Sequence, residues 1–211
     1  MMKKVFLVIV TLLFTPSFCF AGFGYGNVIT GGRVATVAEL SCPTDETSLF
    51  DISDQTDDFA GVSSSTSYVY LGQGNFDPST NLGGTARVCA VSVNVRSIIG
   101  TGAGDMQIEI YEISSINLGS SPTGTCTSAS QTISSTGVTK FTGLDCLLET
   151  GKTYGITLTR TDHSYDAANY IQVYTDTAGS ESGGCWGWGA DKNRADDNSF
   201  EFAIKIWGYN P

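Results

Sequence analysis

The segment Arg87–Arg96, RVCAVSVNVR, decides the fold because its residues alternate in character with a period of two. One row is apolar and consists of Cys89, Val91, Val93 and Val95. The other row is small or polar and consists of Ala90, Ser92, Asn94 and Arg96. Successive side chains of a strand point to opposite faces, and β-branched residues suit a pleated, half-buried surface. The segment therefore predicts a β-strand with one face in a core.

Similar alternation extends outward from this segment. Gly100–Gly104 is a glycine-rich turn, and Met106–Tyr111 (MQIEIY) alternates again, so the two strands predict a hairpin. Further short strands are expected at Tyr68–Leu71, Gln131–Ile133, Thr139–Leu144, Thr153–Arg160, Asn169–Thr175, Cys185–Gly189 and Ser199–Trp207. Only Arg33–Leu40 suits a helical turn. Eight or nine strands separated by Gly, Ser, Asn and Asp turns predict an all-β, two-sheet antiparallel β-sandwich, jelly-roll-like in its connections.

The first 21 residues have the order of a secretory signal peptide. Lys3 and Lys4 precede the apolar run Val5–Phe14, Pro16 breaks it, and small residues precede a cut after Ala21. A buried helix and a lipoprotein cut before Cys19 are the alternatives. We expect residues 22–66 to be a Gly-rich leader and acidic loop segment packing on the domain, and residues 67–211 to be the β-sandwich domain. The mature protein is then secreted or periplasmic.

The chain is acidic, with a formal charge of −10 that becomes −12 when Lys3 and Lys4 leave with the leader. This charge repels phosphate backbones and anionic lipid, so neither nucleic acid nor membrane is an expected partner, and no later segment predicts membrane insertion. Neutral glycans, cationic surfaces and calcium are compatible with it, and simple solubility explains it equally well.

Five cysteines follow the predicted leader: Cys42, Cys89, Cys126, Cys146 and Cys185. In an oxidising compartment they are disulfide candidates, and without a CxxC pair, and with His163 as the only histidine, they do not predict a zinc site. Cys126 and Cys146 bracket two short predicted strands and their turn, which favours a bridge between them. The other pairings stay open, and the odd number leaves one thiol free or paired between chains.

Two tryptophans are the strongest candidates for ligand binding. Trp186 and Trp188 stand two apart among glycines, and Tyr170 and Tyr174, with Tyr165 before them, could extend the same face. Flat aromatic rings with polar edges suit stacking on sugar C–H groups. The alternative is that the tryptophans close the end of the core.

Acidic loops offer a possible calcium site, because Ca²⁺ prefers carboxylate and carbonyl oxygens. The candidate ligands are Asp191, Asn193, Asp196 and Asp197. Lys192 and Arg194 interrupt this set, and a solvated acidic loop is the competing interpretation.

No catalytic residues are predicted. A Ser-His-Asp site would need His163, whose neighbours Asp162 and Ser164 would diverge from it on a strand, and a nucleophile elbow is missing. A pair of glycosidase carboxylates is not marked by any pattern.

The stretch Tyr68–Gly208 resembles a secreted bacterial jelly-roll module of the choice-of-anchor type, which is similar to carbohydrate-binding modules. The matching features are Gly72-Gln73 with Phe76 and Pro78, the central hairpin, Leu148–Leu158 (LETGKTYGITL) and the closing strand Phe202–Gly208. An extra residue, Gly74 or Asn75, precedes Phe76 and leaves the register of the early strand open. The resemblance implies an extracellular binding or display role. The resulting hypothesis is a non-catalytic module for carbohydrate or a cell-surface component, with a self-associating adhesive subunit and a secreted hydrolase as alternatives.

Overall fold

A computed structural model gives the protein as two units, residues 1–40 and 41–211. It describes residues 27–30, 33–36, 47–54, 56, 58–113, 123–176, 185–188, 194–197 and 201–211, with the backbone alone at 27–30, 33–36, 123–125, 176, 185–188 and 194–197. The predicted signal peptide lies outside the described residues. In the first unit, β1 (Asn27–Thr30) pairs with β2 (Arg33–Thr36), so the expectation of a helical turn from Arg33 is wrong. β-Branched residues in both strands favour the hairpin.

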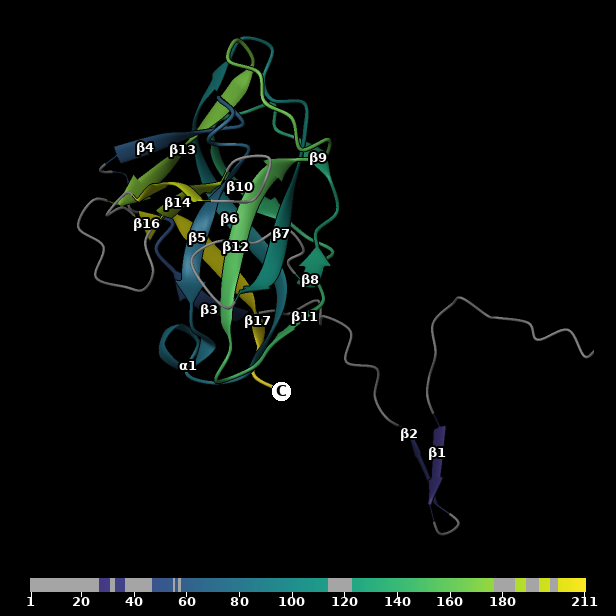
Figure 1. Ribbon diagram of the computed structural model, residues 1–211. Coiled ribbons are helices and arrows are strands. Elements are labelled where there is room, and N and C mark those ends of the chain that lie inside the picture. Colours follow the sequence, from purple (N-terminus) through teal and green to yellow (C-terminus); the bar gives the residue numbers. More distant parts are fainter. Residues whose placement is uncertain are drawn as a thin grey trace, which may run out of the picture. The chain divides into compact units, whose positions relative to one another are not determined.

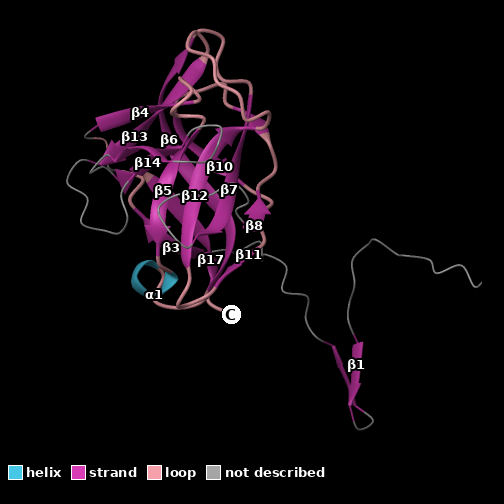
Figure 2. Ribbon diagram, in the orientation of Figure 1, coloured by secondary structure: helices cyan, strands magenta, loops and turns pink. Residues whose placement is uncertain are grey.

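The second unit is an antiparallel sandwich of two sheets, which confirms the predicted fold class (Figures 1 and 2). The eight-stranded sheet contains β3 (Thr47–Asp51), β4 (Asp58–Val62), β6 (Ala86–Ile99), β10 (Gly137–Phe141), β11 (Cys146–Leu148), β13 (Tyr170–Asp176), β16 (Glu201–Phe202) and β17 (Ile204–Tyr209). The seven-stranded sheet contains β5 (Tyr70–Phe76), β7 (Asp105–Ile113), β8 (Thr123–Thr127), β9 (Gln131–Thr132), β12 (Thr153–Arg160), β14 (Cys185–Trp188) and β15 (Arg194–Asp197). A short helix, α1 (Pro78–Asn81), lies between β5 and β6 in the sequence.

The strand that decides the fold, β6, organises the eight-stranded sheet. It pairs with β17, β13, β10 and β11 at successive parts of its length. The chain then moves repeatedly from one sheet to the other, with β5, β7, β12 and β14 in the seven-stranded sheet. The strands outnumber the expected eight or nine because several short strands pair with a single long one.

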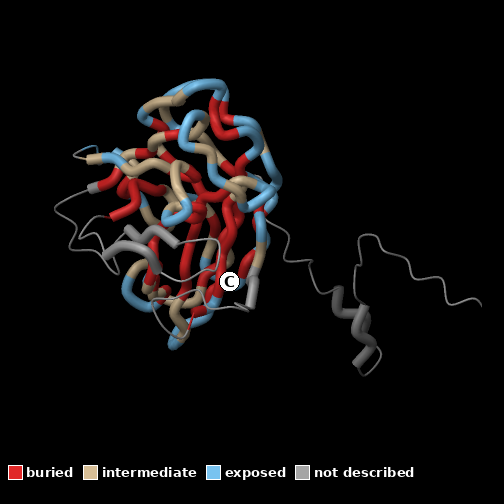
Figure 3. The backbone as a smooth tube through the Cα atoms, turned by 45° about the horizontal axis from the view of Figure 1, so that its top comes forward, coloured by how far each residue is buried: buried red, intermediate tan, exposed pale blue. Residues whose placement is uncertain are grey.

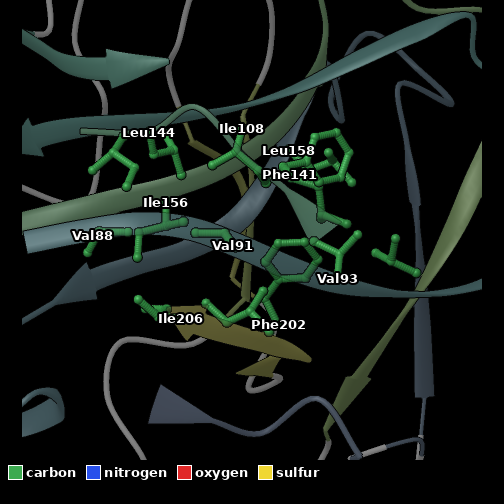
Figure 4. Packing of buried hydrophobic residues seen from close by; sticks show 14 of the residues in the cluster. Val88, Val91, Val93, Ile108, Phe141, Leu144, Ile156, Leu158, Phe202 and Ile206 are labelled. Carbon is green, nitrogen blue, oxygen red and sulfur yellow. The ribbon is translucent and has the colours of Figure 1, made fainter. Parts of the chain in front are cut away.

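The core lies between the sheets, where the inward-facing apolar side chains of the two sheets meet (Figure 4). Val91 and Val93 of β6, Ile156 and Leu158 of β12, and Ile206 of β17 are all fully buried. Figure 3 shows the same division along the chain, with buried strands and exposed connecting turns. Because fully burying one such side chain contributes roughly 1.5–3 kcal/mol, this shared core holds the sheets together.

The early motif of the resemblance has a structural explanation. The side-chain Oε1 of Gln73 accepts a hydrogen bond from the backbone N–H of Phe202 at 3.0 Å, so Gln73 joins the two sheets. The extra residue before Phe76 is taken up by a bulge, because β12 pairs Tyr154 with Phe76 but Ile156 with Gln73. Asn75 lies in the bulge with a positive φ of 51°, a region that asparagine tolerates better than most residues.

The acidic segment contributes more than a loop. β3 pairs with β17, and β4 pairs with β13, so this segment supplies two strands of the eight-stranded sheet. Lys205 Nζ binds Asp51 Oδ2 at 2.6 Å, and this ion pair keeps the pKa of Asp51 below its ordinary value against the opposing effect of desolvation. Apolar Leu49 and Phe50 pack against the core from β3.

The predicted disulfide between Cys126 and Cys146 is present, with Cα atoms 5.7 Å apart. Cys89, which is buried, is also disulfide-bonded. Among the described residues, the structure holds no helix that is both long and apolar enough to cross a membrane.

Candidate functional site

Tyr170 and Tyr174 lie on the outer face of the eight-stranded sheet. Ile171 and Val173, which alternate with them along β13, are fully buried in the core, so the tyrosines face away from it. Both tyrosines are half-buried, and in the described part of the chain neither hydroxyl makes a hydrogen bond. Two polar edges are therefore left for water or a ligand.

Strand β4 places an exposed phenylalanine beside these tyrosines. Phe59 is directly opposite Tyr174 in the β4–β13 register and is 41% exposed. Two residues further along β4, a Cβ at Gly61 would lie only 3.1 Å from ring carbon Cε2 of Tyr170. Glycine thus makes room for the Tyr170 ring, and the outer surface at β4 and β13 is aromatic (the two strands are labelled in Figure 1).

A bulge in β6 brings Arg96 to the same surface. β13 pairs Gln172 with Ser97 but Val173 with Val95, and Arg96 is the extra residue between them. Its guanidinium carbon lies 3.6 Å from the centroid of the Phe59 ring. Its Nη1 donates to Gln172 Oε1 at 3.1 Å, and Ser97 Oγ donates to the same oxygen at 2.5 Å. Stacking and hydrogen bonding together hold the cation in one orientation.

We call Phe59, Arg96, Tyr170, Gln172 and Tyr174 the arginine–aromatic face. Most other described cations are paired with carboxylates: Arg87 with Asp145, Lys152 with Glu112 and Glu149, Arg160 with Asp162, and Lys205 with Asp51. Arg96 is exposed and has no carboxylate at ion-pair distance in the described structure. Among the described side chains, no carboxylate therefore compensates the positive charge of this face.

Trp207 of β17 forms a separate cluster on the same sheet. Its indole N–H donates to Ser92 Oγ at 2.8 Å, and the ammonium groups of Lys140 and Lys205 lie 4.1 and 4.6 Å from its ring centroid. The half-buried ring is thus engaged by neighbours of its own sheet.

The predicted tryptophans are in the other sheet. β14 pairs with β5 so that Trp186 stands opposite Gly72 and Trp188 opposite Tyr70. The structure therefore brings Tyr170 and Tyr174 together on one sheet and places Trp186 and Trp188 on the other. The side chains of the tryptophans lie outside the described part, and so their role in ligand binding stays a prediction.

The calcium prediction also remains untested. Asp191 and Asn193 lie outside the described residues, and Asp196 and Asp197 belong to β15, of which only the backbone is described. Among the side chains that the structure does describe, no group of three or more His, Cys, Asp or Glu could hold a metal ion.

Sequence reasoning missed a second cluster, on the outer face of the seven-stranded sheet. His163 Nε2 lies 2.7 Å from Glu109 Oε1, and Gln107 Nε2 donates to the same oxygen at 2.5 Å. The Glu109 side chain is only 7% exposed and its Oε2 has no hydrogen-bond partner, whereas His163 is 40% exposed. The Tyr70 ring lies 5.2 Å from the His163 ring, and desolvation together with the Glu109 charge raises the pKa of Tyr70 to about 12.

This second cluster pairs His163 with a carboxylate 54 residues away and not with its neighbours. Ser164 Oγ instead donates to Asp162 Oδ1 at 2.8 Å. His163 adopts a positive φ of 51° in the turn that follows β12. The sequence signal for the pair was a single glutamate in the outer row of β7, which is too common a feature to identify a site.

No protein-family model matches the sequence, and no curated protein matches it. Among solved structures, the chain is similar to a clostridial cysteine protease, Cwp84, after propeptide cleavage, with a TM-score of 0.52 and 12% identity. That match covers 80% of this chain and 41% of the other, so this chain spans less than half of its length. A second match is to the cysteine protease and lectin-like domains of Cwp84, a surface layer associated protein of Clostridium difficile, with a TM-score of 0.45, 13% identity, and coverage of 67% and 32%. At such identities the first match supports the fold alone, and the second is too distant to support an argument.

Proposed function

We propose that this protein is an extracellular, non-catalytic binding module whose ligand is carbohydrate, and that the arginine–aromatic face is its binding site. The observation that carries the proposal is the stack of Arg96 on the exposed Phe59, fixed by Gln172 and directly beside Tyr174. Side chains held in one orientation without a partner of opposite charge suit a surface that recognises something outside the molecule.

The chemistry of the face suits a sugar. Aromatic rings such as Tyr174 present a flat apolar surface with a polar edge, and they have few rotatable bonds to lose on binding. Arg96 and Gln172 supply directional hydrogen-bond donors next to that surface. Because these groups project from paired strands, a ligand meets a pre-organised site and loses little free energy to ordering it.

The extracellular part of the proposal is supported by cysteine chemistry. Cys126 and Cys146 are bridged, and Cys89 is disulfide-bonded as well. Disulfides form and persist in oxidising compartments. The order of residues in the predicted leader agrees with export across a membrane.

A glycan array screened with the full secreted chain tests the proposal, followed by calorimetry on the best ligand. We expect Phe59→Ala and Tyr174→Ala each to weaken binding roughly 3- to 10-fold, since an aromatic contact contributes about 0.5–1.5 kcal/mol beyond its area. Leu147→Ala is the matched control, because Leu147 is 40% exposed and lies opposite Arg87 of β6. Arg87 and Arg96 are nine residues apart, about 30 Å at ~3.3 Å per residue. A blank array, or equal losses in all three variants, contradicts the proposal.

A second candidate function, a self-associating surface subunit, is favoured by one observation about cysteines. Cys126, Cys146 and Cys89 are disulfide-bonded, and the partner of Cys89 is a fourth cysteine. Five cysteines follow the predicted leader, so one remains for a bond between chains. Size-exclusion chromatography with and without reductant tests this candidate: a dimer that reductant dissociates supports it, and a monomer under both conditions contradicts it.

A further inference from the structure

We infer that the sugar bound at the arginine–aromatic face is an acidic one, whose carboxylate is received by Arg96. This inference rests on the proposed function and adds the chemical class of the ligand. It is carried by two independent features of the face, the uncompensated charge of Arg96 and an excess of hydrogen-bond donors over acceptors.

The charge argument starts from the composition. The chain has 21 acidic and 11 basic residues, so an exposed arginine has many possible internal partners. The other two arginines with described side chains, Arg87 and Arg160, each have a carboxylate partner. Arg96 instead lies over the Phe59 ring, which attracts the cation without neutralising it. An anionic ligand group therefore meets a full positive charge at this position.

The donor argument comes from the hydrogen bonds. Gln172 Oε1, the nearest acceptor, already receives two donors, from Arg96 and Ser97. Arg96 uses only one of its several N–H donors in this bond, and the amide nitrogen of Gln172 makes no hydrogen bond in the described structure. The tyrosine hydroxyls are also available. A surface that offers donors and little acceptor capacity fits an oxygen-rich anion, and a guanidinium edge matches a carboxylate with two parallel bonds.

Asp58, the described acid next to Phe59 in sequence, does not occupy this position. Asp58 precedes Phe59 on β4, and its Oδ1 accepts the backbone N–H of Phe59 at 2.8 Å. Adjacent residues of a strand face opposite sides, which sets Asp58 apart from the stack. At physiological salt, charges more than about 8 Å apart are largely screened, so a carboxylate in contact with Arg96 interacts mainly with the guanidinium itself.

The aromatic rings select a sugar among carboxylates. A carboxylate alone needs only the guanidinium, whereas Phe59 and Tyr174 add apolar surface next to it that can contact sugar C–H groups. The expected ligand thus places its sugar ring on this aromatic surface and its carboxylate at the edge of the Arg96 guanidinium.

An array of acidic oligosaccharides printed beside their carboxyl-reduced counterparts tests the inference. We expect at least one pair in which the acidic member binds about tenfold or more tightly than the reduced one, as hydrogen bonds to charged groups imply. Arg96→Gln should abolish this preference. Arg96→Lys should restore only part of it, because lysine keeps the charge and loses the planar fork. Lys152→Gln is the control, since it removes the same charge from a residue paired with Glu112 and Glu149.

The outcomes separate the two proposals. Binding to neutral sugars that is insensitive to Arg96→Gln but lost in Tyr174→Ala overturns the acidic-sugar inference and leaves the proposed function intact. Binding to neither member of any pair overturns both. An equal loss of acidic binding in Arg96→Gln and Lys152→Gln assigns the effect to net charge and also overturns the inference. Melting curves of each variant confirm that the exposed substitutions leave the fold intact.

Discussion

The outer faces of the two sheets differ in how their charged residues are placed, because one carries an exposed arginine and the other a buried glutamate. On the eight-stranded sheet, Arg96 is exposed, is oriented by Phe59 and Gln172, and has no ion-pair partner among the described carboxylates. On the seven-stranded sheet, Glu109 is buried, and its contacts with His163 and Gln107 both reach the same oxygen. The first arrangement leaves hydrogen-bond donors and the positive charge of Arg96 for a partner. The second arrangement directs its hydrogen bonds to neighbours inside the molecule, because a buried charge is tolerated only with nearby polar partners.

The comparison predicts that substitutions on the seven-stranded face reduce stability and that substitutions on the arginine–aromatic face reduce binding. The largest expected loss of stability is at Gly72 of the seven-stranded sheet. A Cβ at Gly72 would lie 1.9 Å from the carbonyl oxygen of Ile156, and backbone atoms of β12 cannot move away without breaking the sheet. Gly72→Ala should therefore cost more than about 4 kcal/mol or prevent folding.

Gly61 provides the matched test on the other sheet. A Cβ there would meet the Ser64 hydroxyl at 2.8 Å and the Tyr170 ring at 3.1 Å, both of which are side-chain atoms that can shift. Gly61→Ala should cost about 1 kcal/mol in stability and should weaken glycan binding by displacing Tyr170. Urea denaturation measures both variants, and equal losses of stability would contradict the comparison.

The second prediction concerns alkaline pH. Burial and the nearby Glu109 charge raise the pKa of Tyr70 from 10.0 to about 12, so the folded protein retains a proton that the unfolded chain loses. This contribution is complete below pH 10 and is lost as pH rises from about 10 to about 12. At 1.36 kcal/mol for each tenfold change, it amounts to at most about 2.7 kcal/mol.

The measurement is the free energy of unfolding of wild type and Tyr70→Phe between pH 9 and pH 12. The wild type should lose more stability than the variant over this range. Tyr165→Phe, with a ring that is 50% exposed, is the control and should behave as the wild type does. Parallel curves for wild type and Tyr70→Phe would show that Tyr70 contributes nothing to the alkaline loss.

These effects also show what sequence can and cannot reveal. The strands β6, β7 and β12 were predictable because alternation is local, and the predicted apolar row of Cys89, Val91, Val93 and Val95 is buried. Strands β3 and β4 were harder to recognise, since acidic, Ser and Thr residues obscure their periodicity. The pairing of Tyr174 with Phe59 joins residues more than a hundred positions apart, and the bulge at Arg96 arises from the long-range pairing of β13 with β6.

The third prediction addresses the Glu109–His163 pair. His163→Ala leaves Glu109 with Gln107 as its only described donor and opens the buried carboxylate to solvent on one side. We expect a loss of about 1–2 kcal/mol, within the range for an unsatisfied buried polar group. Tyr165→Ala in the same turn should cost less than about 0.5 kcal/mol, as is usual for an exposed position. If chemical denaturation gives equal losses for the two variants, the Glu109–His163 pair makes no specific contribution to the free energy of unfolding.

The smallest expected effect is on the stability of the arginine–aromatic face itself. Arg96→Gln removes a stack and one hydrogen bond from an exposed side chain, and such surface contacts contribute about 0.5–1 kcal/mol. Thermal unfolding of Arg96→Gln should therefore stay within a few degrees of the wild type, while binding of an acidic glycan falls about tenfold or more. A residue that mainly supported the fold would show the reverse ratio, with a large thermal shift and binding that follows the folded fraction. That reversed result would show that Arg96, like Glu109, mainly supports the fold. The outer faces of the two sheets would then no longer differ in whether their charges serve binding or stability.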